Sequence, residues 1–170
     1  MMIFGGRGHG GRFLNDTWIF DLYKDRWEMV KWDLTCPPPA PRVFASAAAD
    51  PNPDNNDVYL FGGTDGIENY GDLWIFRGHI GRLLSDNLRW ERAVAVGPNP
   101  APRYGHSMVT IGDGRLVVLG GCMVSPQSEV GSLNHKCIHH LDLPCQSISS
   151  HSSLHLTPSK PLPLQGGEGE

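Results

Sequence analysis

The sequence predicts an all-β repeat protein, and three features lead to this prediction. Short apolar or alternating runs, such as residues 58–61 and 72–76, are separated by Gly, Asp and Asn, as in antiparallel strands joined by loops. A Gly-Gly pair follows such a run three times, beginning at Gly5, Gly62 and Gly120, with a period of roughly 58 residues. Further markers recur in the same order. A fixed period of this size is typical of propellers and other repeat arrays.

One complete repeat unit lies at residues 42–96. Its four expected strands are at residues 42–49, 58–61, 72–76 and 90–94. A single four-stranded sheet still has an apolar face to cover, so this unit requires neighbours of its own kind. The sequence supplies them as two partial units, at residues 1–34 and 103–143.

The partial units repeat the strands and the markers of the complete unit. Strands are expected at residues 1–4, 16–22, 27–32, 103–111, 116–119 and, in degenerate form, 136–143. Because a thin sheet must bury large aromatic area, the repeated tryptophans are expected to pack between adjacent units. The markers with an expected structural role are Gly5, Gly6, Asp16, Trp18, Trp27, Arg42, Gly62, Gly63, Asp72, Trp74, Trp90, Arg103, Gly120 and Gly121.

Charge and hydropathy exclude several classes of function. The chain has 170 residues and a formal net charge of −4, which gives no electrostatic footprint for nucleic acid or for an anionic membrane surface. Its longest apolar runs have strand length, and its first residues lack the features of a secretory signal. The four cysteines have no disulfide-framework spacing. We therefore expect a cytoplasmic or nuclear protein with neither a signal peptide nor a transmembrane segment.

The order of these motifs resembles the kelch repeat. The resemblance is carried by Gly-Gly, Asp-x-Trp-Ile-Phe at residues 72–76, Trp-Glu, Pro-x-Pro-Arg and Arg-Tyr-Gly-His-Ser at residues 103–107, and it covers about residues 1–122. Kelch repeats each form one four-stranded blade of a β-propeller, an architecture like that of the galactose oxidase central domain. The resemblance implies an incomplete kelch-type β-propeller, with one complete four-stranded blade flanked by two partial blades, and a structural role for His106.

A tail is expected at residues 144–170. It is rich in Ser, His, Pro and Gly, with scattered Leu. Such a composition cannot bury enough apolar area to offset the entropy of ordering the chain. The sequence therefore predicts a disordered C-terminal tail.

The resemblance implies a protein–protein interaction module that belongs to a larger scaffold or adaptor, such as one joined to an F-box, BTB or phosphatase domain. In kelch proteins, the loops between second and third strands commonly line one face with the connections between blades. The positions on this face are Arg7, His9, Arg12, Asp65 and Glu68. Their charges are expected either to contact a protein partner or to remain solvated. No nucleic-acid or membrane partner is expected, while open blade edges favour self-association.

Two other functions are compatible with the sequence. A metal-dependent enzyme similar to plant specifier proteins would use Glu-x-x-x-Asp-x-x-x-His; Glu68 and Asp72 fit, but position 76 is Phe and His79 is displaced. A kelch oxidase would need a crosslinked Tyr–Cys copper site, and no such pair can be placed from the sequence. The chain could also be a truncated product without independent function. No cofactor is expected.

A cluster of thiols and imidazoles near the C-terminus has no zinc-site spacing, because it contains no Cys-x-x-Cys pair. Its members are Cys122, His135, Cys137, His139, His140 and Cys145. We therefore expect no metal site there.

Overall fold

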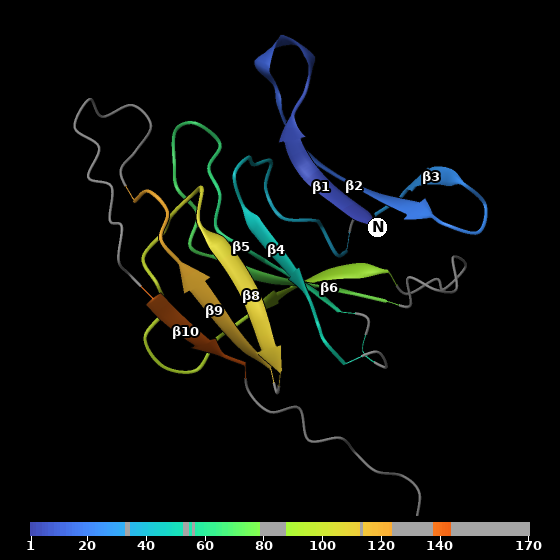
Figure 1. The fold of residues 1–170 in the computed structure, drawn as a ribbon. Coiled ribbons are helices and arrows are strands. Elements are labelled where there is room, and N and C mark those ends of the chain that lie inside the picture. Colours follow the sequence, from blue (N-terminus) through green and yellow to red (C-terminus); the bar gives the residue numbers. More distant parts are fainter. Residues whose placement is uncertain are drawn as a thin grey trace, which may run out of the picture.

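A computed structural model of the chain describes residues 1–32, 35–52, 55, 57–78, 88–112, 114–123 and 138–143, with the backbone alone at 138–140 and 142. Apart from one short 3-10 turn, η1 (His9–Gly11), the regular elements of these residues are β-strands. They form three antiparallel sheets that follow one another along the chain, shown in Figure 1. The sheets are consecutive blades of an incomplete β-propeller, which confirms the predicted fold class.

Each blade is a meander, because strands adjacent in the sequence pair with each other. Blade 1 contains β1 (Met2–Arg7), β2 (Phe13–Asp21) and β3 (Arg26–Met29). Blade 2 contains β4 (Ser46–Ala49), β5 (Val58–Phe61), β6 (Leu73–Arg77) and β7 (Arg89–Ala93). Blade 3 contains β8 (Ser107–Gly112), β9 (Arg115–Leu119) and β10 (Ile138–Asp142). The boundaries predicted for the repeat units, 1–34, 42–96 and 103–143, stay predictions, and the predicted tail lies outside the described residues.

The first strands of blades 2 and 3 begin later than predicted. They were expected to start at Arg42 and Arg103, but β4 and β8 begin four residues after these arginines. Phe44 and Gly105 lie in between with φ of 57° and 64°, a left-handed conformation that interrupts the extended chain before each strand. The arginines are therefore anchors in front of the strands and not part of them.

Trp90 joins blade 1 to blade 2. Its indole is 3% exposed, lies edge-on to Phe4 at 5.0 Å and contacts Phe76 at 5.2 Å. The indole N–H donates to Oγ1 of Thr17, 3.1 Å away and also buried. Because a buried indole needs a partner for its N–H, this bond allows the large ring to fill the interface without an unsatisfied donor. The prediction that tryptophans pack between blades is confirmed for Trp90.

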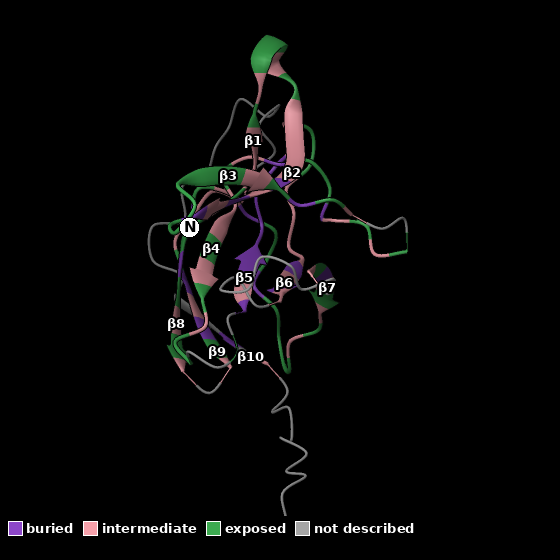
Figure 2. Cartoon of the chain, turned by 90° about the vertical axis from the view of Figure 1, so that its right-hand side faces the viewer, coloured by how far each residue is buried: buried purple, intermediate pink, exposed green. Residues whose placement is uncertain are grey.

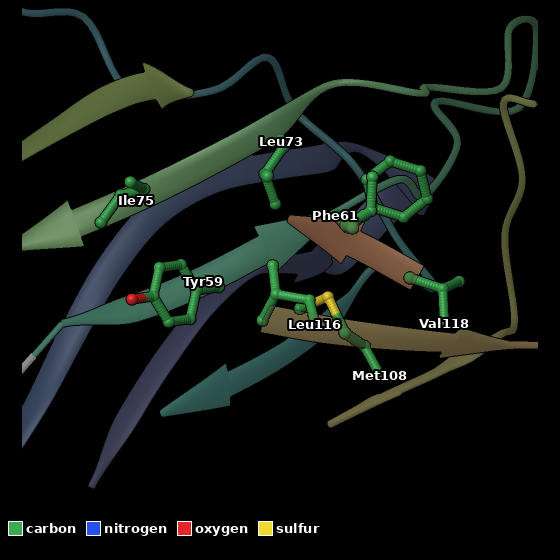
Figure 3. Close-up of a cluster of buried hydrophobic side chains, with 8 residues drawn as sticks. Tyr59, Phe61, Leu73, Ile75, Met108, Leu116 and Val118 are labelled. Carbon is green, nitrogen blue, oxygen red and sulfur yellow. The ribbon is translucent and has the colours of Figure 1, made fainter. Parts of the chain in front are cut away.

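A second apolar cluster joins blade 2 to blade 3. Figure 3 shows Tyr59, Phe61 and Ile75 of blade 2 facing Met108 and Val118 of blade 3. All are buried, and Figure 2 shows that β5 and β6 contain much of the buried chain whereas β3 is largely exposed. Blade 2 is covered on both faces, so it is the packing centre of the described structure.

The Arg42 side chain connects the strands of blade 2 from within. It is 1% exposed and forms a two-pronged ion pair with Asp72, with Nη1–Oδ1 at 2.6 Å and Nη2–Oδ2 at 2.9 Å. Nη1 also donates to the Gly62 carbonyl and Nε to that of Ala40. The guanidinium carbon lies 4.1 Å from the centre of the Tyr70 ring. Burial of the charge is tolerated because the guanidinium is paired and hydrogen-bonded.

The Arg42 backbone binds the preceding blade. Its N–H donates to the Leu14 carbonyl at 3.1 Å, and its own carbonyl accepts from the N–H of Gly6 at 2.9 Å. The next junction repeats both bonds, from Arg103 N–H to Tyr70 carbonyl at 3.1 Å and from Gly63 N–H to Arg103 carbonyl at 2.9 Å. One arginine per junction thus holds two blades, with its backbone on one and its side chain on the other.

These junctions explain the first glycine of the pairs in blades 1 and 2, since a Cβ on Gly5 would lie 2.9 Å from the Arg42 carbonyl oxygen. Gly62 has φ of 69°, and a Cβ built there would lie 2.5 Å from the Arg103 carbonyl oxygen and 2.7 Å from Cε1 of His106. Any side chain would separate blades 2 and 3 at the point where their backbones are linked. The predicted need for glycine at this position follows from the approach of the next blade.

The other markers repeat part of this network. Trp18 donates its indole N–H to Asp16 at 2.7 Å, as Trp74 does to Asp72 at 2.6 Å. Arg103 donates to the Ala101 and Gly120 carbonyls, as Arg42 does to Ala40 and Gly62. Figure 1 allows the three blades to be compared directly.

We expect Asp72→Asn to reduce the free energy of unfolding by roughly 3 kcal/mol, because it leaves a buried guanidinium without its counter-charge. Urea unfolding followed by tryptophan fluorescence measures this loss. Asp50→Asn is a control, since that carboxylate is hydrogen-bonded but has no arginine partner within the described part of the chain. An equal effect of both substitutions would contradict a special role for the ion pair between Arg42 and Asp72.

His106 is buried behind Phe61, with the two rings edge-on at 5.4 Å. Burial and, next, the positive charge of Arg103 lower the pKa of His106 to about 4. The neutral imidazole is therefore the form that the fold accommodates, in keeping with the structural role that the resemblance implies.

We expect the fold to lose roughly 1–3 kcal/mol of stability between pH 6.5 and pH 4, since the unfolded chain takes up the His106 proton first. Urea unfolding at both pH values should show this loss in the wild type and a smaller loss in His106→Gln. The difference between the two proteins isolates the imidazole from the carboxylates, which titrate lower. Identical pH dependence in both proteins would contradict the assignment.

Candidate partner-binding site

A cavity of about 570 Å³ opens between blades 1 and 2, and the segment that leads into blade 3 also contributes to its lining. Met2, Phe4 and Leu60 lie among the apolar residues of its wall. The lining is completed by Gly6, Arg7, Phe13, Arg42, Val43, Phe44, Ala45, Ala47, Thr64, Gly66 and Tyr104. A concave, mostly apolar space with a few polar groups is the usual form of a recognition site.

Aromatic rings form one side of the cavity. Phe44 lies 6.2 Å from the Tyr104 ring, and Phe13 extends to within 3.0 Å of the position that a Cβ on Gly66 would occupy. Phe13 belongs to blade 1, Phe44 to blade 2 and Tyr104 to the segment leading into blade 3. Rigid aromatic side chains are the residues that most often provide binding energy at protein interfaces.

Phe44 is in an unfavourable position for the fold. Its side chain is 66% exposed, and its φ of 57° is an outlier for a bulky residue. The corresponding residue of the next junction, two positions after its arginine, is Gly105, which adopts the same conformation without steric cost. Such strain in an exposed aromatic residue is typical of functional positions.

The structure brings Arg7 and the loop of Asp65 to this cavity. Arg7 lines it at the end of β1 and forms no ion pair within the described part of the chain. Arg42, the other arginine of the lining, is neutralised by Asp72. Arg7 is therefore the exposed cation of the site. In Figure 1 the β1–β2 hairpin and the loop between β5 and β6 rise on the same side.

The other residues predicted for the binding face differ in their positions and contacts. His9 and Arg12 are exposed in the β1–β2 hairpin and do not line the cavity. Asp65 accepts hydrogen bonds from the N–H groups of Ile67 and Glu68 and from the Tyr70 hydroxyl. The N–H of Glu68, with the other donors, lowers the pKa of Asp65 although burial opposes this. Asp65 therefore shapes its loop, while Glu68 is exposed beside it.

Tyr104 and Cys122 form a pair that was not evident in the sequence. The two residues exchange backbone hydrogen bonds of 3.0 and 2.8 Å across an isolated bridge. A hydrogen bond between their side chains, and then burial, raises the pKa of Tyr104. Sequence reasoning missed this hydrogen-bonded pair, because the bridge joins residues that are distant in sequence. Cys122 is not part of the cavity lining.

The residues of the metal-dependent alternative are not assembled as a ligand set in the described chain. Burial raises the pKa of Asp72, but the hydrogen bonds and charge of Arg42, with the indole of Trp74, outweigh this and hold it below its usual value. His79 lies outside the described residues. Among those described, no three His, Cys, Asp or Glu side chains are placed to hold a metal ion. Nor does a described helix have the length and apolarity to span a membrane.

Comparison with known proteins agrees with this architecture. A family model described as the KLHDC2/KLHL20/DRC7 kelch-repeats domain matches residues 1–166. The chain is 34% identical over 79% of its length to acyl-CoA-binding domain-containing protein 5 of Arabidopsis thaliana. It is 30% identical over 70% of its length to the human Rab9 effector protein with kelch motifs, and 29% identical over 74% to human host cell factor 1.

The chain spans 19%, 29% and 6%, respectively, of the lengths of the plant protein, the Rab9 effector and host cell factor 1. What these proteins share with it is therefore the repeat region. With three blades of the expected topology, an arginine at both junctions and a family match over almost all its residues, the chain belongs to the kelch-repeat family.

Proposed function

We propose that the chain is a protein-binding kelch module whose cavity between blades 1 and 2 takes an apolar side chain of an extended partner segment. A carboxylate next to that side chain would pair with Arg7. Phe44 is the observation that carries the proposal, because an exposed ring is held there in a conformation that costs the fold stability.

The chemistry of the lining supports this partner class. Phe13, Phe44 and Tyr104 provide rigid apolar area, and Arg7 provides the exposed charge of the lining. A charge at the rim of an apolar pocket orients a ligand and selects against the wrong partner. One relative is named an effector of Rab9, so interaction with another protein is a function found among kelch proteins. A scaffold or adaptor role in the cytoplasm or nucleus, within a longer protein, is the setting we propose.

The proposal can be tested with a display library of random peptides selected on the full chain. We expect the selected peptides to contain an aromatic or aliphatic residue beside Asp or Glu. Phe44→Asn should weaken their binding by at least about tenfold, since Asn removes the ring but tolerates positive φ. Leu22→Asn is the matched control, because Leu22 is also exposed but lies in the β2–β3 hairpin of blade 1.

Arg7→Glu should change the selected charge from acidic to basic. Peptides that bind wild type and Phe44→Asn equally well would overturn the site. Failure to select any peptide from the library would count against protein binding through this surface.

The substitution of Phe44 should also change the stability of the fold. We expect Phe44→Asn to increase the free energy of unfolding by roughly 1 kcal/mol, because it relieves a strained backbone and removes little buried area. Urea unfolding of the purified proteins measures the change. A clear loss of stability would mean that Phe44 is there for packing.

A further inference from the structure

Two loops in the same position of consecutive blades carry opposite charge. Residues 7–12, at the turn between β1 and β2, contain no Asp or Glu, and residues 64–69, between β5 and β6, contain no Lys, Arg or His. We call them the positive loop and the negative loop. Their charged or titratable residues are Arg7, His9 and Arg12 in the positive loop and Asp65 and Glu68 in the negative loop.

The two loops are neighbours on one side of the molecule (Figure 1). Phe13, which directly follows the positive loop, lies 3.0 Å from the position that a Cβ on Gly66 of the negative loop would occupy. Arg7 is the strand partner of Phe13, and both Arg7 and Gly66 line the cavity between blades 1 and 2. Because an extended chain spans about 3.3 Å per residue, a partner segment of a few residues that crosses the cavity can meet both loops.

The opposite charges of the two loops do not neutralise each other. Within the described residues, Arg7, Arg12 and Glu68 are exposed and form no ion pair. The Arg7 guanidinium lies over its own loop, with Nη2 3.1 Å from the position of a Cβ on Gly11. Asp65 is held by N–H groups of its own loop and by a tyrosine hydroxyl. The face therefore presents one positive and one negative end to a partner, an arrangement that orients a ligand of complementary charge.

We propose that the two loops select a partner segment with charges of opposite sign on either side of its apolar residue. The carboxylate of the segment lies over the positive loop, and a Lys or Arg of the segment lies beside Glu68. This inference rests on the function proposed for the cavity, and it adds the second charge and hence the polarity of the partner. A segment with two like charges is repelled by one of the loops, so the face also rejects wrong partners.

Selection of peptides from the random display library on the wild-type chain and on Glu68→Lys tests the polarity. Peptides selected on the wild type should contain Lys or Arg on one side of the apolar residue and Asp or Glu on the other. Selection on Glu68→Lys should replace the basic residue by an acidic one and leave the first acidic residue in place. Glu68 is exposed, so the fold should persist, as near-ultraviolet circular dichroism can verify.

A double-mutant cycle then tests the contact with Glu68. Replacing the basic residue of a peptide selected on the wild type by Gln should weaken its binding to the wild type by about three- to fivefold, the size of an exposed ion pair. The same change should have no effect on binding to Glu68→Gln. Asp25→Asn is the matched control and should keep the full effect, because Asp25 is exposed in the β2–β3 hairpin and Asn tolerates its positive φ.

The possible failures separate this inference from the function on which it rests. Selected peptides with an apolar and an acidic residue but no enriched basic residue would overturn the inference and leave the cavity site standing. An equal effect of the peptide change on the wild type and on Glu68→Gln would do the same. A library that yields no binding peptide would overturn both.

Discussion

The described structure depends on a buried arginine at each junction between blades. Arg42 is bound to blade 1 through its backbone and to blade 2 through its side chain, and Arg103 repeats the backbone part at the next junction. A guanidinium removed from water is costly unless its donors are satisfied, and Asp72, Gly62 and Ala40 provide the acceptors here. The register of one blade on the next is therefore fixed by hydrogen bonds of the arginine backbone and side chain.

The apolar packing and the candidate site follow from this constraint. With the junctions fixed, Trp90 fills the interface between blades 1 and 2, and the cluster around Phe61 fills the next. The chain must turn sharply between the anchoring arginine and the first strand, which produces the left-handed residue at Phe44. The turn brings its exposed ring beside Tyr104 and over the cavity. The anchoring of the blades by the arginines thus also determines the position of Phe44, the residue that we propose binds the partner.

Much of the architecture could be predicted from the sequence because each blade has the same short sequence motifs, which recur at a nearly constant spacing. The strand β5 was located to the residue, and the Gly-Gly pairs and Asp–Trp pairs marked equivalent positions in the blades. The burial of Arg42 could not be derived, since a charged residue before a strand is normally exposed and its partner Asp72 is distant in sequence. The sequence predicts Phe44 to lie in a strand, because aromatic residues favour strands. Its left-handed backbone conformation is evident only in the folded structure. Tyr104 and Cys122 meet through the pairing of a blade, which no local pattern encodes.

The central claim is that the arginine junctions make the blades one cooperative unit. Native-state hydrogen exchange of the backbone amides of Gly6, Arg42, Gly63 and Arg103, followed by NMR, tests it most directly. The account predicts that these amides are protected to about the same degree as the amides of β5, since they open only when the blades separate. Fast exchange of the four amides, with β5 still protected, would contradict it and would mean that each blade is stable without its junctions.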